Sequence, residues 1–312
     1  SFPTRRSSDL LHALDSQTGE SLWNYTVVDE YNTYLFNNAW RFRIAIVTDG
    51  KIYIEHTEHS PFDPKPRGAP FICLDLETGE ELWRINLRGT EWGNTAAIGD
   101  SIIVRDNTYD QRVYAIGKGP SETSVTIQNN IGSLGDQVMV QGSVMDISAG
   151  TQDYEITARF PKGVPAVSDD DMTPWMEYVY TQKERPSDVT GVMVSIDAVD
   201  PNGNFVSLGT ATTDSSGFFK TMVTPEIEGE YTIIASFMGS KSYWPSYDET
   251  ALGVMPQTSP DTPIEPEEPT DGTPDGDQPT TTPLITTEIA IVIAVAAIAA
   301  IGVAAYWMLK RK

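Results

Sequence analysis

The sequence is short of cysteine, histidine and basic residues. Among 312 residues there are three His and a single Cys, Cys73, which excludes a disulfide framework and any metal centre built from several cysteines. Lys and Arg number 21 against 44 Asp and Glu, so the formal net charge is −23. Phosphate contacts require clustered Lys and Arg side chains. Nucleic acid is therefore not expected as a partner.

Long apolar runs are also absent, except near the carboxyl end. From Ile289 to Leu309 the sequence is uncharged and almost wholly apolar. At ~1.5 Å per residue, residues 288–309 would span a ~30 Å hydrocarbon core as a helix. The basic tail 310–312 follows directly. Because basic residues stay on the cytoplasmic side, we expect a single-pass membrane helix in contact with lipid and a cytoplasmic tail. A buried helix of a soluble domain is rarely this long and uncapped.

The segment 256–287 lacks aromatic and basic residues altogether. It holds eight Pro, nine Thr and seven acidic residues. Such a composition cannot bury enough apolar surface to offset the entropy lost on ordering. We expect an extended, disordered stalk of up to ~100 Å, which holds the preceding domains, placed outside the cell, away from the membrane.

The amino-terminal end has no initiator Met and no apolar signal segment. Residues 1–10 (SFPTRRSSDL) resemble the translation of a short-read sequencing adapter, so we exclude them from the fold prediction. The alternative is an ordinary basic loop. Either a processed or a truncated chain is expected.

A hairpin motif occurs twice at a spacing of 60 residues. Its pattern is Asp-x-x-Thr-Gly-Glu-x-Leu-Trp, and its repeated positions include Asp15, Gly19 and Trp23 in the first copy and Asp75, Gly79 and Trp83 in the second. The pattern predicts a strand, a tight turn and a second strand, with each Gly supplying a positive φ.

A degenerate third copy begins at Val113. Partner strands are expected over 47–54 and 97–104, and aligning them places Asp49 opposite Gly99. With insertions of ten and eight residues removed, the repeating unit is about 42 residues of antiparallel strand. That is the size of one propeller blade.

This motif resembles the tryptophan-docking repeat of pyrroloquinoline-quinone-type (PQQ-like) β-propellers. The resemblance implies that residues 11–120 form about two carboxyl-terminal blades, that Trp23 and Trp83 pack between blades, and that Cys73 fills the small inward position held by Ala13. Enzymes of that family bind PQQ and Ca²⁺ on the propeller axis. None of their site motifs is matched here, and a blade motif indicates a scaffold rather than a site. We therefore predict no cofactor, catalytic residue or metal ligand from this motif.

Two insertions are the candidates for recognition, because loops at one face of a propeller usually carry its contacts. The side chains expected to contact a ligand, either sugar or peptide, are Tyr31, Tyr34, Phe36, Trp40 and His59. The alternative is that these loops pack on their own side chains. His56 and His59, together with Glu55 and Glu58, could hold a divalent metal or form a solvated strand end. Asn24 is the one N-glycosylation acceptor.

Residues 121–255 predict a second domain. Strand-like runs separated by Gly and Asn turns are expected over 124–127, 137–146, 191–199, 205–212, 218–223 and 229–237. This pattern is typical of an antiparallel β-sandwich, and the stretch 190–254 is similar to immunoglobulin-like repeats of prokaryotic surface proteins. Asp169, Asp170 and Asp171, within a long interruption, are weak candidates for a calcium site. The alternative is a solvated acidic run.

The order of these parts, all-β domains followed by stalk and membrane helix, resembles membrane-anchored PQQ-like propeller proteins of archaea. The resemblance implies a non-catalytic cell-surface protein that binds or scaffolds an unknown extracellular protein or glycan. One alternative is a PQQ-dependent dehydrogenase-like enzyme whose active centre lies in missing amino-terminal blades. Another is a purely structural envelope protein.

Overall fold

The computed structural model describes residues 10–27, 42–58, 70–87, 89–90, 96–181 and 183–257. Most of these residues are in β-strands, and all of them belong to one compact unit. The predicted stalk beyond residue 257, the predicted membrane helix and the tail lie outside the described residues. Within the described part, no helix is long and apolar enough to cross a membrane.

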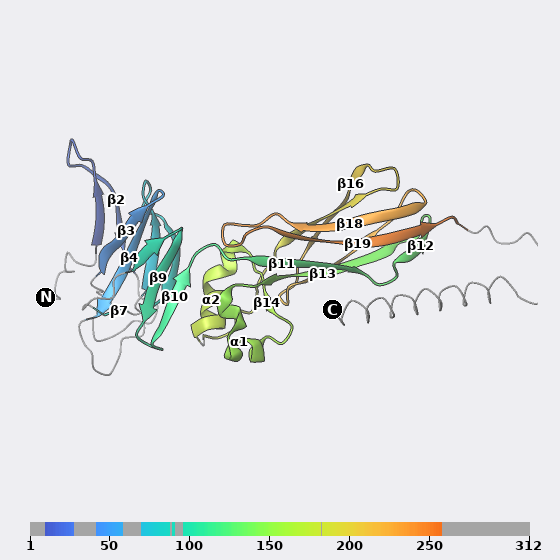
Figure 1. The fold of residues 1–312 in the computed structure, drawn as a ribbon. Helices are drawn as coiled ribbons and strands as arrows, with labels where there is room; N and C mark the ends of the chain where they lie inside the picture. The colour runs from blue at the N-terminus through green and yellow to red at the C-terminus, as the bar shows by residue number, and fades with distance from the viewer. Residues whose placement is uncertain are drawn as a thin grey trace, which may run out of the picture. The chain divides into compact units, whose positions relative to one another are not determined.

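The described residues between 10 and 116 form three largely antiparallel sheets (Figure 1). The first consists of β1 (Leu10–Leu14) and β2 (Ser21–Thr26). The second runs β3 (Phe42–Thr48), β4 (Lys51–Glu58), β5 (Pro70–Asp75) and β6 (Glu81–Asn86), with the short β7 (Gly89–Thr90) parallel to β4. The third runs β8 (Ala97–Gly99), β9 (Ile102–Asn107) and β10 (Arg112–Ile116). Leu10, excluded from the fold prediction, pairs with Thr26.

The repeated motif forms a turn held by its own side chains. Asp75 Oδ1 accepts hydrogen bonds from the backbone N–H groups of Glu77 at 2.9 Å and Thr78 at 2.8 Å. These donors, that of Thr78 first, hold the pKa of the Asp75 carboxyl below its usual value. The glycine then turns the chain back with φ of 73°. Asp15 and Gly19 repeat this geometry, with φ of 77° at Gly19, so the predicted hairpin is confirmed.

Neighbouring sheets pack face to face through the tryptophan of the motif. The indole N–H of Trp23 donates to the carbonyl of Leu76 at 3.3 Å, and its ring lies directly against Gly79. Trp23 and Tyr25 thereby cover the apolar face of the second sheet formed by Ile72 and Leu74. The first sheet therefore packs against Gly79, the motif glycine of the second copy.

The opposite face of the second sheet packs on the third. Trp83 lies 5.9 Å, centroid to centroid, from the rings of both Tyr53 and Phe71. These side chains form one buried cluster with Ile103 and Ala96 of the following segment. Each motif tryptophan thus lies between two sheets.

The turn in the third sheet shows that the alignment predicted from the repeat, Asp49 opposite Gly99, is wrong by one residue. The β3–β4 turn has positive φ at Asp49 and Gly50, and the β8–β9 turn has positive φ at Asp100 and Ser101. A two-residue turn with positive φ at both central residues has a backbone twist that matches the right-handed twist of the strands on either side. Asp49 therefore corresponds to Asp100 rather than Gly99, and the insertions are nine residues each.

Residues 121–255 form a two-sheet β-sandwich. One sheet contains β11 (Ser121–Ile127), β13 (Val138–Asp146), β14 (Val164–Pro165) and β17 (Phe218–Val223). The other runs β12 (Ile131–Ser133), β19 (Ser246–Met255), β18 (Gly229–Phe237), β15 (Met193–Val199) and β16 (Phe205–Thr212). The six strands predicted from the sequence are confirmed, three of them with the predicted bounds.

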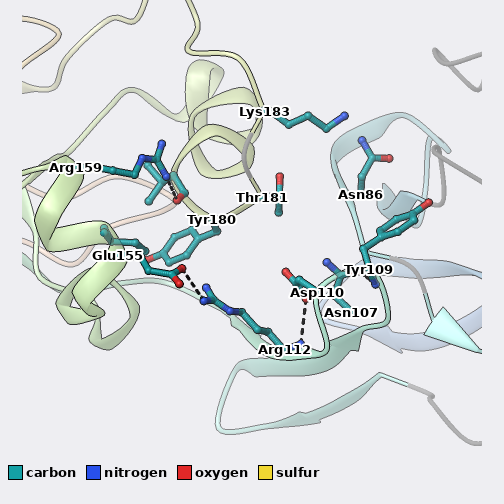
Figure 2. A pocket seen from close by; sticks show the side chains of 12 residues that line it. Asn86, Asn107, Tyr109, Asp110, Arg112, Glu155, Arg159, Tyr180, Thr181 and Lys183 are labelled. Carbon is teal, nitrogen blue, oxygen red and sulfur yellow. Dashed lines mark hydrogen bonds and ion pairs between the residues drawn. The ribbon is translucent and has the colours of Figure 1, made fainter. Parts of the chain in front are cut away.

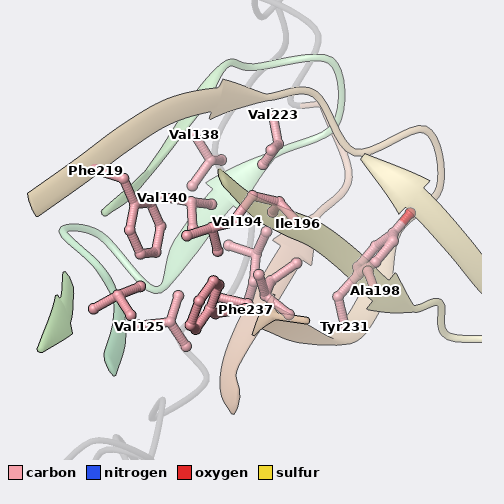
Figure 3. Packing of buried hydrophobic residues seen from close by; sticks show 14 of the residues in the cluster. Val125, Val138, Val140, Val194, Ile196, Ala198, Phe219, Val223, Tyr231 and Phe237 are labelled. Atoms are coloured by element: carbon pink, nitrogen blue, oxygen red, sulfur yellow. The ribbon is translucent and has the colours of Figure 1, made fainter. Parts of the chain in front are cut away.

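Period-two alternation builds the sandwich core. Val194, Ile196 and Ala198 of β15 face inward, as do Tyr231 and Ile233 of β18. Figure 3 shows these strands opposite β11, β13 and β17, with Phe219 and Phe237 between the sheets. β12 pairs parallel with β19. The chain crosses from one sheet to the other between β16 and β17, because β16 pairs with β15 and β17 pairs with β13.

Two helices were not predicted. They are α1 (Tyr154–Arg159) and α2 (Met172–Thr181), accompanied by short 3-10 turns over 149–152 and 169–171. Trp175 and Val179 of α2 are four residues apart and lie on one buried face. Because each helix is short and its apolar stripe holds few residues, the sequence carries only a weak helical period. We call residues 149–181 the helical insertion.

Gly79→Ala is expected to destabilise the protein by about 2–4 kcal/mol. A Cβ at this position would lie 2.5 Å from the indole ring of Trp23, and overpacking adds about 1–3 kcal/mol to the cost of a left-handed φ. Gly19→Ala is the matched control, because Gly19 has the same positive φ with nothing within 4 Å. Urea unfolding measures both; equal losses for the two variants would contradict the packing of Trp23 on Gly79.

Candidate functional site

The residues predicted to contact a ligand in the first insertion, Tyr31, Tyr34, Phe36 and Trp40, lie outside the described residues, as does His59. The structure therefore does not place them. Asn24 lies exposed on β2, so it faces outward as glycosylation requires.

Glu55 has a different role from the metal ligand considered above. Its side chain is fully buried and forms an ion pair with the guanidinium of Arg105, which is also fully buried. Glu55 Oε1 accepts a second hydrogen bond from Arg43 Nε at 2.7 Å. Burial lowers the pKa of Arg105, and the charge of Glu55 opposes that shift. Because Glu55 is on β4 and Arg105 is on β9, this pair joins the second and third sheets.

Cys73 is in the position that the resemblance implied. Its side chain is fully buried among Phe71, Tyr53 and the residues of the third sheet. Burial raises the pKa of the Cys73 thiol to about 11. A thiol that is neutral and inaccessible serves as a small core residue.

The acidic run of the helical insertion makes hydrogen bonds within the protein. Asp169 Oδ1 accepts from Ser240 Oγ at 2.9 Å and from the N–H of Ser242 at 3.0 Å. Asp171 Oδ2 accepts from Ser168 Oγ at 2.9 Å and from the N–H of Thr190 at 2.8 Å. Two of the three calcium candidates therefore tie the insertion to neighbouring loops. The described residues contain no group of three or more His, Cys, Asp or Glu placed to hold a metal.

A pocket of about 980 Å³ lies between the third sheet and the helical insertion (Figure 2). Figure 2 shows Glu155, Arg159 and Tyr180 on the side of the insertion, and Tyr109, Asp110 and Asn86 on the side of the sheets. The rest of the lining consists of Asn107, Arg112, Ile156, Val179, Thr181 and Lys183. Sequence reasoning missed this site, because its residues are spread over nearly 100 positions.

Polar contacts hold the two walls of this pocket together. Arg112 Nη2 pairs with Glu155 Oε2 at 2.8 Å. Asn86 Nδ2 donates to Glu177 Oε1 at 2.8 Å. The hydroxyl of Tyr114 donates to the carbonyl of Tyr180 at 3.2 Å.

Arg159 supports the wall formed by α2. Its guanidinium donates to the carbonyls of Val179 at 3.0 Å and Tyr178 at 2.9 Å, and it lies 4.7 Å from the centre of the Tyr178 ring. An arginine bound in this way caps the carboxyl end of α2. It is a fixed positive charge at the edge of the pocket.

Most of the side chains that line the pocket are polar. Two tyrosines and two arginines belong to the residue types enriched at recognition surfaces. A lysine and two asparagines add further hydrogen-bonding groups. Asp110, Glu155 and Thr181 complete the polar part of the lining.

Comparisons with known proteins give no family. No family model matches the sequence, and no curated protein matches it. A Salmonella alpha-2-macroglobulin structure is 11% identical, with a TM-score of 0.24 over 67% of this chain and 12% of its own. A tetra-tandem repeat from the extending region of a large adhesion protein is 12% identical, with a TM-score of 0.29 over 69% of this chain and 48% of its own.

Fibronectin(III)-like modules of Clostridium thermocellum CbhA are 10% identical, with a TM-score of 0.26 over 74% of this chain and 100% of theirs. The chain therefore spans about an eighth to one half of the length of the first two structures. At these TM-scores the matches carry no conclusion about function.

The described residues do not match the donor set that a PQQ and calcium site would need. Such a site requires carboxylate groups gathered around a cation, and the part of the chain that the structure describes brings no three together. The single Cys is buried. We therefore derive no step through either group.

Arg105→Met is expected to destabilise the protein by about 2–4 kcal/mol, because the buried Glu55 carboxylate loses its buried partner and keeps the pairing with Arg43, which is 40% exposed. The double variant Glu55→Leu/Arg105→Met should recover most of that loss, since both charges are then removed. Arg112→Met is the control: its ion pair with Glu155 is exposed, so it should cost less than about 1 kcal/mol. The free energy of unfolding in urea measures each variant. Equal losses for Arg105→Met and Arg112→Met would contradict the importance of the buried pair.

The Cys73 thiol is expected to be unreactive in the folded protein. Its pKa of about 11 leaves little thiolate near neutral pH, and its side chain is fully buried. Ellman's reagent at pH 8 should label one thiol per chain only in urea, with the same midpoint as unfolding. Full labelling of the native protein within minutes would show that Cys73 is accessible.

Proposed function

We propose that the protein is a non-catalytic cell-surface binding protein, and that the pocket between the third sheet and the helical insertion is its recognition site. The observation that carries this proposal is the pocket itself. Its volume falls in the usual range for ligand sites, and two separate parts of the fold form its walls. The ligand is an extracellular protein segment or a glycan, both of which match a lining of tyrosine, arginine and asparagine.

We also propose that the three sheets are blades of a PQQ-like propeller and that the sandwich is an immunoglobulin-like domain. The packing of Trp23 on the next sheet and the four-strand order of the second sheet support the first assignment. The packing of two largely antiparallel sheets on one core, with the chain crossing between them, supports the second.

Residues 288–309 would anchor the protein in the membrane with its domains outside, and residues 256–287 would be the spacer. The apolar length of the first segment, the basic tail 310–312 and the Pro- and Thr-rich composition of the second support this arrangement. The order of parts matches the resemblance to archaeal surface proteins.

The double variant Tyr109→Ala/Lys183→Ala is expected to lose at least about tenfold in affinity for the glycan or peptide that the full-length chain binds on arrays. The matched control is Tyr247→Ala/Lys241→Ala, which removes an exposed tyrosine and an exposed lysine from the sandwich. Equal binding by both double variants would move the recognition site elsewhere. If the full-length chain bound nothing on either array, the result would favour a structural envelope protein.

A further inference from the structure

One ion pair joins the two walls of the recognition pocket. Glu155 is on α1 of the helical insertion, Arg112 is the first residue of β10, and Glu155 Oε2 lies 2.8 Å from Arg112 Nη2. Both residues line the pocket, and Figure 2 shows the Glu155 carboxylate turned toward Arg112. The pocket therefore contains a carboxylate of the protein itself, bound to an arginine of the opposite wall.

This ion pair is easily exchanged. The Arg112 side chain is 43% exposed and the Glu155 side chain is 67% exposed. Ion pairs this accessible to water contribute little to stability, because both groups are well solvated when they separate. The hydrogen bonds that Asn86 and Tyr114 donate to the helical insertion hold the two walls together independently of this pair. A carboxylate from outside can therefore replace Glu155 at Arg112 without opening the pocket.

The pocket lining carries a small excess of positive charge, although the chain as a whole has a formal net charge of −23. Its charged side chains are three basic and two acidic ones, namely Arg112, Arg159, Lys183, Asp110 and Glu155. A concave site with an excess of one charge attracts ligands of the opposite charge. Displacement of Glu155 by a ligand would increase that excess.

Asp110, the other acidic residue of the lining, is bound within its own turn. Its carboxylate accepts hydrogen bonds from the backbone N–H of Arg112 at 3.0 Å and from the hydroxyl of Tyr114. Glu155 is instead held through its contact with the opposite wall. Of the two acidic side chains, Glu155 is therefore the one that a ligand can displace.

We propose that the pocket binds an acidic glycan, and that a uronic acid carboxylate takes the place of the Glu155 carboxylate at Arg112. This inference rests on the proposed function, because it names the ligand of the same pocket. The planar guanidinium of arginine matches a carboxylate with two parallel, charge-assisted hydrogen bonds. The rings of Tyr109 and Tyr180, which also line the pocket, provide aromatic surface for the apolar faces of the sugar rings.

The lining favours a glycan over an acidic peptide. Peptides are commonly held through their main chain at a sheet edge, or as a helix in an apolar groove. Here most of the lining consists of polar side chains from a turn and from α1 and α2, and its aliphatic residues are Ile156 and Val179. The amides of Asn86 and Asn107 complete a surface of donors and acceptors, which suits a ligand rich in hydroxyl groups.

The test is calorimetry of the full-length chain with tetramers of galacturonic acid and of glucuronic acid, each compared with its methyl ester. An ester has the same sugar rings without the charge. At least one acid should bind at least about tenfold more tightly than its ester. Arg112→Gln should abolish this preference, because it removes the partner of the ligand carboxylate.

Glu155→Gln separates displacement by a ligand from a purely structural ion pair. Because this variant lacks the competing carboxylate, it should bind the acid about threefold more tightly or better, and the ester within about twofold of the unmodified chain. Glu122→Gln is the matched control: it makes the same change in net charge at an exposed residue of β11 outside the pocket. It should leave the affinity for the acid within about twofold.

Circular dichroism establishes that the three variants are folded. Three results would overturn the inference: no binding of either acid at millimolar concentration, equal binding of acid and ester, or weaker binding of the acid by Glu155→Gln. Tighter binding of a hexa-aspartate peptide than of either acid would also overturn it, because the ligand would then be an acidic protein segment. If the esters bound as well as the acids and Tyr109→Ala/Lys183→Ala removed that binding, this inference would be wrong while the pocket remained the recognition site.

Discussion

A small residue opposite a tryptophan determines how the sheets of residues 10–116 stack. Ala13 and Cys73 leave room for Trp23 and Trp83 on the neighbouring strand, and each indole then extends between two sheets. Trp23 lies against Gly79, where no side chain separates ring from backbone. The turn motif is therefore both the end of one hairpin and the surface on which the preceding one packs.

Charge is used differently inside and outside these sheets. Asp15 and Asp75 lie in turns, where each accepts backbone hydrogen bonds. Glu55 and Arg105, by contrast, form an ion pair in which both side chains are fully buried. A buried pair of this kind adds little net stability over apolar residues, but it strongly disfavours any packing that separates the two charges. It therefore selects one arrangement of the second and third sheets.

The helical insertion connects the third sheet to the sandwich and forms one wall of the pocket. Trp175 and Val179 build its small core, and Asp169 and Asp171 bind it to loops of the sandwich. On its other side, Glu177 and Glu155 bind Asn86 and Arg112. Because contacts on both sides hold the insertion in place, it forms a rigid wall of the pocket.

The sequence by itself determined the strands, the hairpin turns and the small position of Cys73, because those depend on residues close together in the chain. Alternating apolar residues predicted β15 to β18 of the sandwich, and Asp-x-x-Thr-Gly predicted both hairpins. The tertiary structure alone decided the partner of Glu55, the roles of Asp169 and Asp171 and the pocket lining. Each of these requires side chains from distant segments to meet, and no local periodicity records which segments do so. The tertiary structure also decided where the helices form, because α1 and α2 are stabilised by the packing of a short apolar face rather than by intrinsic helix propensity.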